Sequence, residues 1–291
     1  MKLAIIANPV SGRGRAFRAI QNYAREWPHP DWEVEILSTR GQNHAGQLAQ
    51  ELVQRPPDIL AICGGDGTIN EIATYLPQPP FPIALLPAGT ANVLARELGL
   101  PLNPVGALKI ALRGRTRRID LGCLGPGSRR RFIFVGGVGF DACVVSIVRP
   151  GLKTKLGMAA YALAILECLK NYPFPEFEVT INNRTIQATS FLACNSKRYG
   201  GGLLFCPDAD MNDGMLDLLV LEGRRRVGLA RFLFQAWLGR AEKGEWIHRL
   251  RSSTVRIEGP QGVLIQADGE LVGGLPLEVS LTASAFPLVI P

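Results

Sequence analysis

Residues 60–71 combine an apolar segment with residue types that suit phosphate binding. Leu60 to Cys63 are apolar, residues 64–68 are Gly-Gly-Asp-Gly-Thr, and a helical pattern begins at Ile69. Glycine has no Cβ and tolerates positive φ, so the backbone N–H groups of such a loop can approach an anion closely. The partially positive N-terminus of the following helix points to the same place. The segment therefore predicts a phosphate site at the carboxyl end of a strand.

Two further loops of similar composition also follow strand-like segments. Residues 8–14 are Asn-Pro-Val-Ser-Gly-Arg-Gly, and residues 87–92 are Pro-Ala-Gly-Thr-Ala-Asn. Because the carboxyl ends of parallel strands meet at one edge of a sheet, we expect the three loops to form one ligand site. Neither a Walker A lysine motif nor the G-x-G-x-x-G dinucleotide motif is present. Nucleotide phosphates would therefore be held by the backbone.

Asp66, inside the second loop, has two interpretations. It could cap the helix that begins at Ile69, because aspartate is a favoured N-cap. It could instead act on a ligand, since a carboxylate beside a phosphate is repulsive unless Mg²⁺ lies between them or the carboxylate accepts a proton. Asn70 and Glu71, in the first helical turn, suit both capping and nucleotide contacts.

Strand and helix patterns alternate over the first 120 residues, which is typical of a doubly wound α/β domain with a parallel sheet. The expected strands are 3–7, 32–38, 59–63 and 83–86, and the expected helices are 16–27, 44–54, 69–76, 91–98 and 104–112.

Short strands dominate after Asp120, which predicts an antiparallel sandwich or barrel. The expected strands are 131–135, 177–181, 185–194, 216–221, 254–258 and 263–267, with helical insertions at 155–170 and 227–240. Residues 283–290 form a further apolar strand that could return to either part. We therefore expect a nucleotide-binding domain at 1–120, which 283–291 could rejoin, and a substrate and metal domain at 121–282.

The composition excludes some classes of protein. The net charge of +7 is spread along the chain without a basic tail or recognition helix, which disfavours nucleic-acid binding but suits anionic lipid headgroups or phosphorylated substrates. The six cysteines form no C-x-x-C pair and indicate free thiols in a reducing cytoplasm. No signal-peptide pattern is present, and the apolar helical stretch 156–169 is too short to span a bilayer.

Two acidic segments in the second half could also carry chemistry. Residues 266–270 are Gln-Ala-Asp-Gly-Glu, which is either an ordinary hairpin turn or a pair of carboxylates able to activate a hydroxyl or hold a metal. Residues 207–217 contain four aspartates, which suit a hard cation such as Mg²⁺ or a solvated acidic loop.

These motifs together resemble the diacylglycerol kinase catalytic-domain family, in its bacterial soluble lipid kinase branch, to which sphingosine and ceramide kinases are related. The resemblance implies an N-terminal α/β domain like that of NAD kinases and phosphofructokinases, followed by an antiparallel β-sandwich domain, with ATP bound between them. The motifs that carry it are Asn8-Pro9-x-Ser11-Gly12, Gly64-Gly65-Asp66-Gly67-Thr68-x-Asn70-Glu71, Pro87-x-Gly89-Thr90-Ala91-Asn92 and Asp268-Gly269-Glu270.

The resemblance also implies roles for individual residues. Glu270 matches the proton acceptor of bacterial members, and Asp66 matches that of the sphingosine branch, with Asp268 in the same catalytic motif as Glu270. An Mg²⁺ site is implied at Asp210, Asp213 and Met215, although the family often has an apolar residue in place of Asp210. The residues expected at ATP are Asn8, Ser11, Thr39, Gly65, Asp66, Gly67, Thr68, Ile69, Asn70, Glu71 and Thr90.

The implied reaction is transfer of the γ-phosphoryl group of ATP to the hydroxyl of diacylglycerol or a related glycerolipid. Residues 227–246 mix aromatic residues with arginines, which suits either a membrane interface or a core helix with a solvated basic face. We therefore expect a cytoplasmic enzyme with a lipid substrate and transient peripheral membrane contact, and a homodimer is possible. The alternatives are an NAD kinase, which shares the Gly-Gly-Asp-Gly-Thr loop, and a non-catalytic nucleotide- or lipid-binding regulator.

Overall fold

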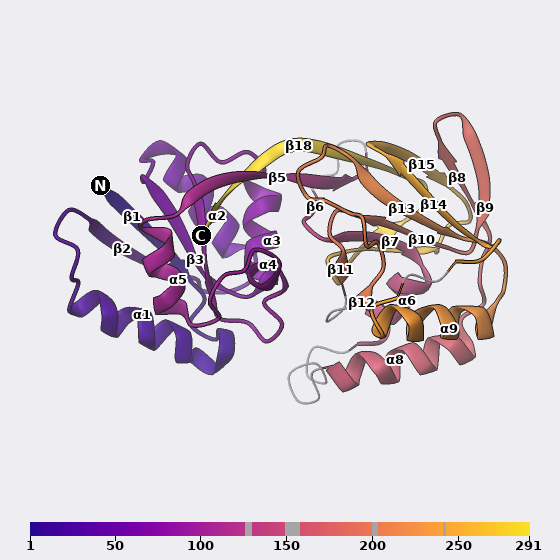
Figure 1. The fold of residues 1–291 in the computed structure, drawn as a ribbon, viewed down its shortest axis with the longest axis horizontal. Helices are drawn as coiled ribbons and strands as arrows, with labels where there is room; N and C mark the ends of the chain where they lie inside the picture. Colours follow the sequence, from indigo (N-terminus) through magenta and orange to yellow (C-terminus); the bar gives the residue numbers. More distant parts are fainter. Residues whose placement is uncertain (126–129, 149–157, 200–202, 241–242) are drawn as a thin grey trace. The chain divides into compact units, whose positions relative to one another are not determined.

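The chain divides into two compact units, Met1–Ile119 with Ser284–Pro291, and Asp120–Ala283 (Figure 1). The structure is a computed structural model that describes residues 1–125, 130–148, 158–199, 203–240 and 243–291. Residues 155–157, the expected start of a helix, lie outside the described residues.

The first unit is built on a parallel sheet with strand order β2-β1-β3-β4, beside which the end of β18 pairs with β4. Continuous apolar runs form β1, β3 and β4 because helices cover both faces, whereas apolar and polar residues alternate at the start of the edge strand β2. The strands are β1 (Lys2–Ala7), β2 (Glu33–Ser38), β3 (Ile59–Gly64) and β4 (Ile83–Pro87).

Helices cover each face of this sheet. Ile20 of α1 (Arg15–Arg25) and Leu108 of α5 (Pro104–Ala111) pack with alternate strand residues such as Ile5 in one apolar core. On the other face, α2 and α3 pack against each other and against β1 and β3. The remaining elements of this unit are η1 (Ser11–Gly14), α2 (His44–Glu51), η2 (Leu52–Gln54), α3 (Asp66–Tyr75) and α4 (Val93–Glu97). This arrangement confirms the predicted α/β class.

The second unit contains two antiparallel sheets. One has the order β18-β15-β8-β9, with β5 paired to β18 and β6, and the other has the order β14-β13-β10-β7-β16-β17. The strands are β5 (Arg115–Leu124), β6 (Arg130–Phe132), β7 (Val135–Gly139), β8 (Phe177–Ile181), β9 (Arg184–Ala188), β10 (Ser190–Cys194), β11 (Arg198–Tyr199), β12 (Leu203–Leu204), β13 (Leu216–Leu221), β14 (Ile247–Ser252), β15 (Thr254–Glu258), β16 (Leu264–Ala267), β17 (Glu270–Gly274) and β18 (Leu277–Ile290). The chain passes between the two units within β5 and within β18, so each of these strands contains residues of both units.

Side chains alternate across β10 and are buried on both faces. Phe191 and Ala193 belong to the apolar core of the sandwich, whereas Ser190 and Leu192 point to the other face, where α6 (Phe140–Ile147), α8 (Met158–Asn171) and α9 (Arg226–Trp237) lie (Figure 1). The predicted sandwich is confirmed, with helices added to one of its faces. Among the described residues no helix is long and apolar enough to cross a membrane.

Some predicted elements are divided differently in the structure. The expected strand 185–194 is two strands, because the chain passes at Thr189 from β9, which pairs with β8, to β10, which pairs with β7 and β13. The Thr189 hydroxyl donates to the carbonyl of Gly223 at 2.8 Å, which fixes this crossing. Helix α6 was not expected, because its apolar sequence lacks a one-sided helical pattern.

Candidate active site

Three loops of the first unit meet at the carboxyl edge of its parallel sheet. The N–H of Asn8 donates to the carbonyl of Cys63 at 2.9 Å, and the N–H of Ala88 donates to the carbonyl of Gly64 at 2.9 Å. The chain after β1, β3 and β4 is therefore joined by backbone hydrogen bonds. Thr39, after β2, joins the same edge, since its N–H donates to the carbonyl of Ala7 at 2.9 Å.

Close contacts between these loops require glycine at positions 12 and 89. A Cβ on Gly12, whose φ is +56°, would lie 2.5 Å from the carbonyl oxygen of Ala88. A Cβ on Gly89 would lie 2.7 Å from the Cα of Gly65. These glycines let the loops pack backbone to backbone, so their first task is structural.

Gly67 differs from the other glycines of these loops. A Cβ at this position would have nothing within 4 Å, and the residue is exposed in the first turn of α3. Packing within the protein therefore does not require glycine at position 67. Open space above a helix N-terminus fits the approach of an anionic ligand to the backbone.

Asp66 does not cap a helix at Ile69, so that interpretation is wrong. Helix α3 begins at Asp66 itself, with Gly65 as its N-cap residue. The Asp66 carboxylate instead accepts the N–H groups of Val93 at 3.1 Å and Leu94 at 3.2 Å, the first two residues of α4. A carboxylate at a helix N-terminus is stabilised by the free N–H groups there, and it ties the second loop to the third.

The remaining expected nucleotide residues differ in exposure and in contacts. Thr39, Thr68, Ile69 and Asn70 are buried, and the Oδ1 atom of Asn70 has no hydrogen-bond partner. Glu71 accepts the N–H of Gly46 at 3.1 Å, which joins α3 to α2. Asn8 and Ser11 are half-buried, and Thr90 is exposed.

The second unit places Asp268 and Glu270 at a tight hairpin between β16 and β17. Asp268 and Gly269 both have positive φ, 47° and 85°, as two-residue hairpin turns require. The half-buried Asp268 carboxylate accepts the N–H groups of Ile133, Phe134 and Val135 at 2.6, 2.9 and 2.9 Å. Burial raises the pKa of Asp268 to about 7, and these three hydrogen bonds together with Arg130 act against the rise.

Glu270 is the accessible carboxylate of this turn. Its side chain is 48% exposed and forms an ion pair with the guanidinium group of Arg130. Both Asp268 oxygens are engaged by backbone N–H groups, whereas the Glu270 carboxylate is accessible to solvent.

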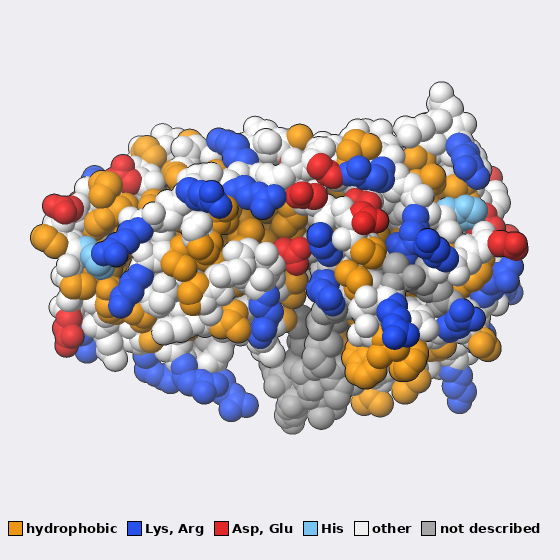
Figure 2. Space-filling view, viewed as in Figure 1, with side chains coloured by type: hydrophobic (Ala, Val, Ile, Leu, Met, Phe, Trp, Pro, Cys, Tyr) orange, Lys and Arg blue, Asp and Glu red, His pale blue; other side chains and the backbone are white. Residues whose placement is uncertain are grey.

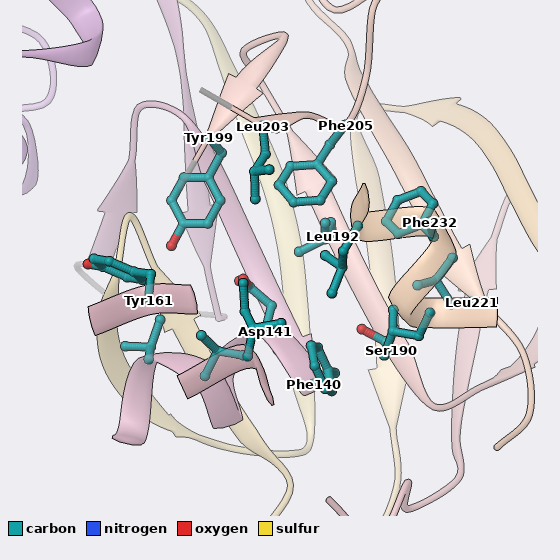
Figure 3. A pocket seen from close by; sticks show the side chains of 15 residues that line it. Phe140, Asp141, Tyr161, Ser190, Leu192, Tyr199, Leu203, Phe205, Leu221 and Phe232 are labelled. Carbon is teal, nitrogen blue, oxygen red and sulfur yellow. The ribbon is translucent and has the colours of Figure 1, made fainter. Parts of the chain in front are cut away.

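An apolar pocket of about 50 Å³ lies between the helices and the outer face of the sheet (Figure 3). Figure 3 shows Asp141 and the hydroxyl groups of Tyr161 and Tyr199 on one side, with Leu221 and Phe232 on the opposite side. A Cβ on Gly269 would lie 3.6 Å from the Tyr199 hydroxyl and 4.0 Å from the Tyr161 hydroxyl. The polar side of the pocket therefore adjoins the turn that carries Glu270.

Asp141 is a pocket residue that the sequence analysis missed. Gln266 links it to the turn: its Nε2 donates to Asp141 at 2.5 Å, while its Oε1 accepts the Gly269 N–H at 2.7 Å and the Tyr199 hydroxyl at 3.1 Å. Burial raises the pKa of Asp141 to about 7, and the hydrogen bond from Gln266 acts against the rise. Its position two residues after the glycine-rich segment 136–139 was the available signal.

The expected metal loop is held mainly by protein contacts. Asp213 accepts the Met215 N–H at 3.0 Å and pairs with Arg251, and Asp210 accepts the Asn212 N–H at 3.1 Å. In the described part of the chain, no three acidic, histidine or cysteine side chains are grouped to hold a metal ion.

Hard oxygen donors are nevertheless concentrated around this loop. Burial raises the pKa of Asp217, Arg251 lowers it, and the negative charges of Asp213 and Asp208 raise it further. The chemistry of these carboxylates fits a hard cation, which would reduce their mutual repulsion.

Known proteins resemble the chain over both units. Residues 2–124 match the diacylglycerol kinase catalytic domain, and residues 135–290 match the YegS C-terminal NAD kinase beta sandwich-like domain. A diacylglycerol kinase from Mycobacterium tuberculosis is 32% identical over 296 residues, which cover 100% of this chain and 95% of the relative.

The chain belongs to the diacylglycerol kinase family.

Solved structures agree with this family's fold. The crystal structure of a diacylglycerol kinase from Bacillus anthracis has a TM-score of 0.75 and 21% identity, covering 100% of this chain and 97% of that one. An NAD kinase from Archaeoglobus fulgidus in complex with ATP has a TM-score of 0.52 and 16% identity, covering 100% and 93%. The likeness to NAD kinase is one of fold. As a member of the diacylglycerol kinase family, the chain is a lipid kinase, and membership implies the use of ATP.

The contact between Gly65 and Gly89 predicts that alanine substitutions at Gly89 and at Gly67 change the stability of this kinase differently. Gly89→Ala forces a Cβ against the Gly65 backbone and should lower the free energy of unfolding by about 1–3 kcal/mol. Gly67→Ala meets no atom and should leave it unchanged or raise it by up to about 1 kcal/mol, because alanine favours the helix more than glycine does. Urea denaturation of both variants measures the difference, and equal stability would show that the two loops are not packed as described.

Asp141 should make stability depend on pH. Its folded pKa near 7 lies above its ordinary value of 3.8, so between these pH values the folded protein binds more protons than the unfolded chain and stability falls as pH rises. Relative to Asp141→Asn, the wild type should lose at most about 1.4 kcal/mol per pH unit. Urea denaturation from pH 4 to 7 tests this, since Asp268 titrates in both proteins. Parallel pH curves would contradict it.

Proposed function

We propose that this lipid kinase transfers the γ-phosphoryl group of ATP to the hydroxyl of diacylglycerol or a related glycerolipid. The observation that carries the proposal is the apolar pocket whose polar side adjoins Gly269, the residue directly before the exposed Glu270. An apolar pocket with a few polar groups at one side suits an amphipathic ligand whose hydroxyl points to those groups. The name of the Mycobacterium tuberculosis relative supports the choice of diacylglycerol.

ATP would bind at the three loops of the first unit. The open space at Gly67 and the N-terminus of α3 support phosphate binding through backbone N–H groups. The proposed nucleotide residues are Asn8, Ser11, Thr39, Gly65, Asp66, Gly67, Thr68, Ile69, Asn70, Glu71 and Thr90. Phosphoryl transfer depends mostly on positioning and charge stabilisation, so such a cradle needs no lysine of the Walker type.

Glu270 is our choice for the base that orients the lipid hydroxyl and accepts its proton. It is exposed, whereas the Asp66 carboxylate already accepts two backbone N–H groups and the Asp268 carboxylate three. Asp268 would then act as a positioning residue that holds the turn, and Asp66 would organise the nucleotide loops.

Mg²⁺ would act at two places, with the ATP phosphates and at the acidic loop. When bound, the ion supplies positive charge that neutralises phosphate oxygens. Asp210, Asp213 and the backbone carbonyl of Met215 would hold the second ion, in competition with the Asp213–Arg251 ion pair.

The enzyme would act in the cytoplasm at the bilayer surface. NAD phosphorylation remains an alternative reaction for this fold. The apolar pocket favours a lipid, because NAD is polar and charged along most of its length.

Phosphorylation of a lipid panel with labelled ATP tests the reaction. Wild-type protein should label diacylglycerol more strongly than phosphatidylglycerol, a polyprenol or a long-chain base, and should not label NAD. Glu270→Gln should lower kcat by about 10²–10⁴-fold while the Kd for ATP stays unchanged. Asp66→Asn should mainly weaken ATP binding. Full kcat in Glu270→Gln would reject Glu270 as the base, and labelling of NAD alone would reject the lipid reaction.

Mg²⁺ should stabilise the protein apart from its role in catalysis. Adding MgCl₂ to metal-free protein should raise Tm by about 2–4 °C for each kcal/mol of binding free energy. Asp213→Asn removes a charged ligand and should abolish most of this rise, whereas Asp31→Asn, at an exposed position of the first unit, should keep it. The same Tm rise in both variants would reject the acidic loop as the Mg²⁺ site.

A further inference from the structure

Helices α8 and α9 expose large apolar side chains on their outer faces. Leu163 and Leu166 of α8 are 55% and 64% exposed, and Phe234 and Trp237 of α9 are 56% and 68% exposed. The rings of Phe234 and Trp237 lie 5.9 Å apart. Figure 2 shows apolar side chains gathered with basic ones beside them where Figure 1 draws these helices. Such a cluster is unusual on a protein that has no partner there.

The inner faces of the same two helices line the apolar pocket. Ile165 of α8 and Leu229, Phe232 and Leu233 of α9 are among its lining residues. The two helices pack against each other, so a single helix layer separates the pocket from the exposed apolar surface.

The charge around this surface is positive. Residues 223–240 contain five arginines and no acidic residue, and Arg224, Arg225 and Arg240 are exposed. Arg226 has a structural task, since it donates to carbonyl groups at the end of α8, including that of Leu169 at 2.5 Å. Glu167 is the acidic residue of α8 and is exposed.

We propose that the outer face of α8 and α9 docks on an anionic phospholipid bilayer, from which the lipid substrate enters the pocket beneath these helices. The proposal rests on the proposed function for its substrate, but the docking itself does not. Aromatic and aliphatic side chains would enter the headgroup region, and arginines would contact lipid phosphates while their stems cover apolar surface. A protein partner would not explain why the patch directly overlies the pocket.

Vesicle sedimentation tests the docking without any catalytic readout. Wild-type protein should bind vesicles of phosphatidylcholine with phosphatidylglycerol more tightly than vesicles of phosphatidylcholine alone, and added salt should weaken binding. The double variants Phe234→Ser/Trp237→Ser and Arg224→Gln/Arg225→Gln should each lower the partition coefficient by about tenfold or more. The matched controls Leu102→Ser and Arg25→Gln/Arg256→Gln, at exposed positions elsewhere, should bind like wild type.

Kinase assays with two forms of substrate separate docking from chemistry. Phe234→Ser/Trp237→Ser should lose activity on diacylglycerol in vesicles but keep activity on a water-soluble short-chain diacylglycerol. Unchanged vesicle binding in this variant would overturn the docking proposal, whereas absence of lipid phosphorylation in wild type would reject the proposed function alone. A change in oligomeric mass by light scattering, with vesicle binding intact, would assign the face to a second copy of the chain and also overturn the proposal.

Discussion

The second unit depends on one interaction, the acceptance of three consecutive backbone N–H groups by Asp268. Withdrawing a carboxylate from water costs free energy unless hydrogen bonds compensate, and the N–H groups of Ile133, Phe134 and Val135 provide them. The contact joins the β16–β17 hairpin to the segment between β6 and β7. Gln266 then extends the network to Asp141. The position of Glu270 follows from this network, because the residue directly follows the anchored turn.

In the first unit, loops are held in place by glycine contacts and backbone hydrogen bonds. Parallel pairing of β1, β3 and β4 brings three loops to one edge, and Gly12 and Gly89 allow them to touch. Asp66 holds the loop after β4 in place, because its carboxylate accepts the N–H groups of Val93 and Leu94. The two aspartates of the Asp-Gly motifs thus share a role: each uses its carboxylate to fix a loop, and each leaves a neighbouring group accessible, Gly67 in one unit and Glu270 in the other.

The sequence predicts this fold class because strands buried on both faces are continuous apolar runs and turns carry glycine and aspartate. The β13 boundaries were predicted to the residue for that reason, and those of β8 and β15 were also predicted to the residue, because apolar and polar residues alternate along them. Long-range hydrogen bonds could not be predicted from the sequence. Nothing near Asp66 in the chain indicates that Val93 and Leu94 are the hydrogen-bond partners of Asp66. Asp141 was missed for a related cause: its importance comes from Gln266, 125 residues away, and from burial that a single sequence does not reveal.

The pocket lies outside the core of the sandwich, and this has consequences for how it can accept a ligand. Its walls are the outer face of β10 and β13 and the side chains of α6, α8 and α9, whereas Phe191, Ala193 and Leu218 form the core on the other face of the sheet. Because helices form one side of the pocket, a shift of α8 and α9 would enlarge it without repacking the core of the sandwich. Such a shift would leave the three backbone hydrogen bonds to Asp268 in place, because their donors, Ile133, Phe134 and Val135, lie outside α8 and α9. Local opening of this kind costs less free energy than any movement within the sandwich.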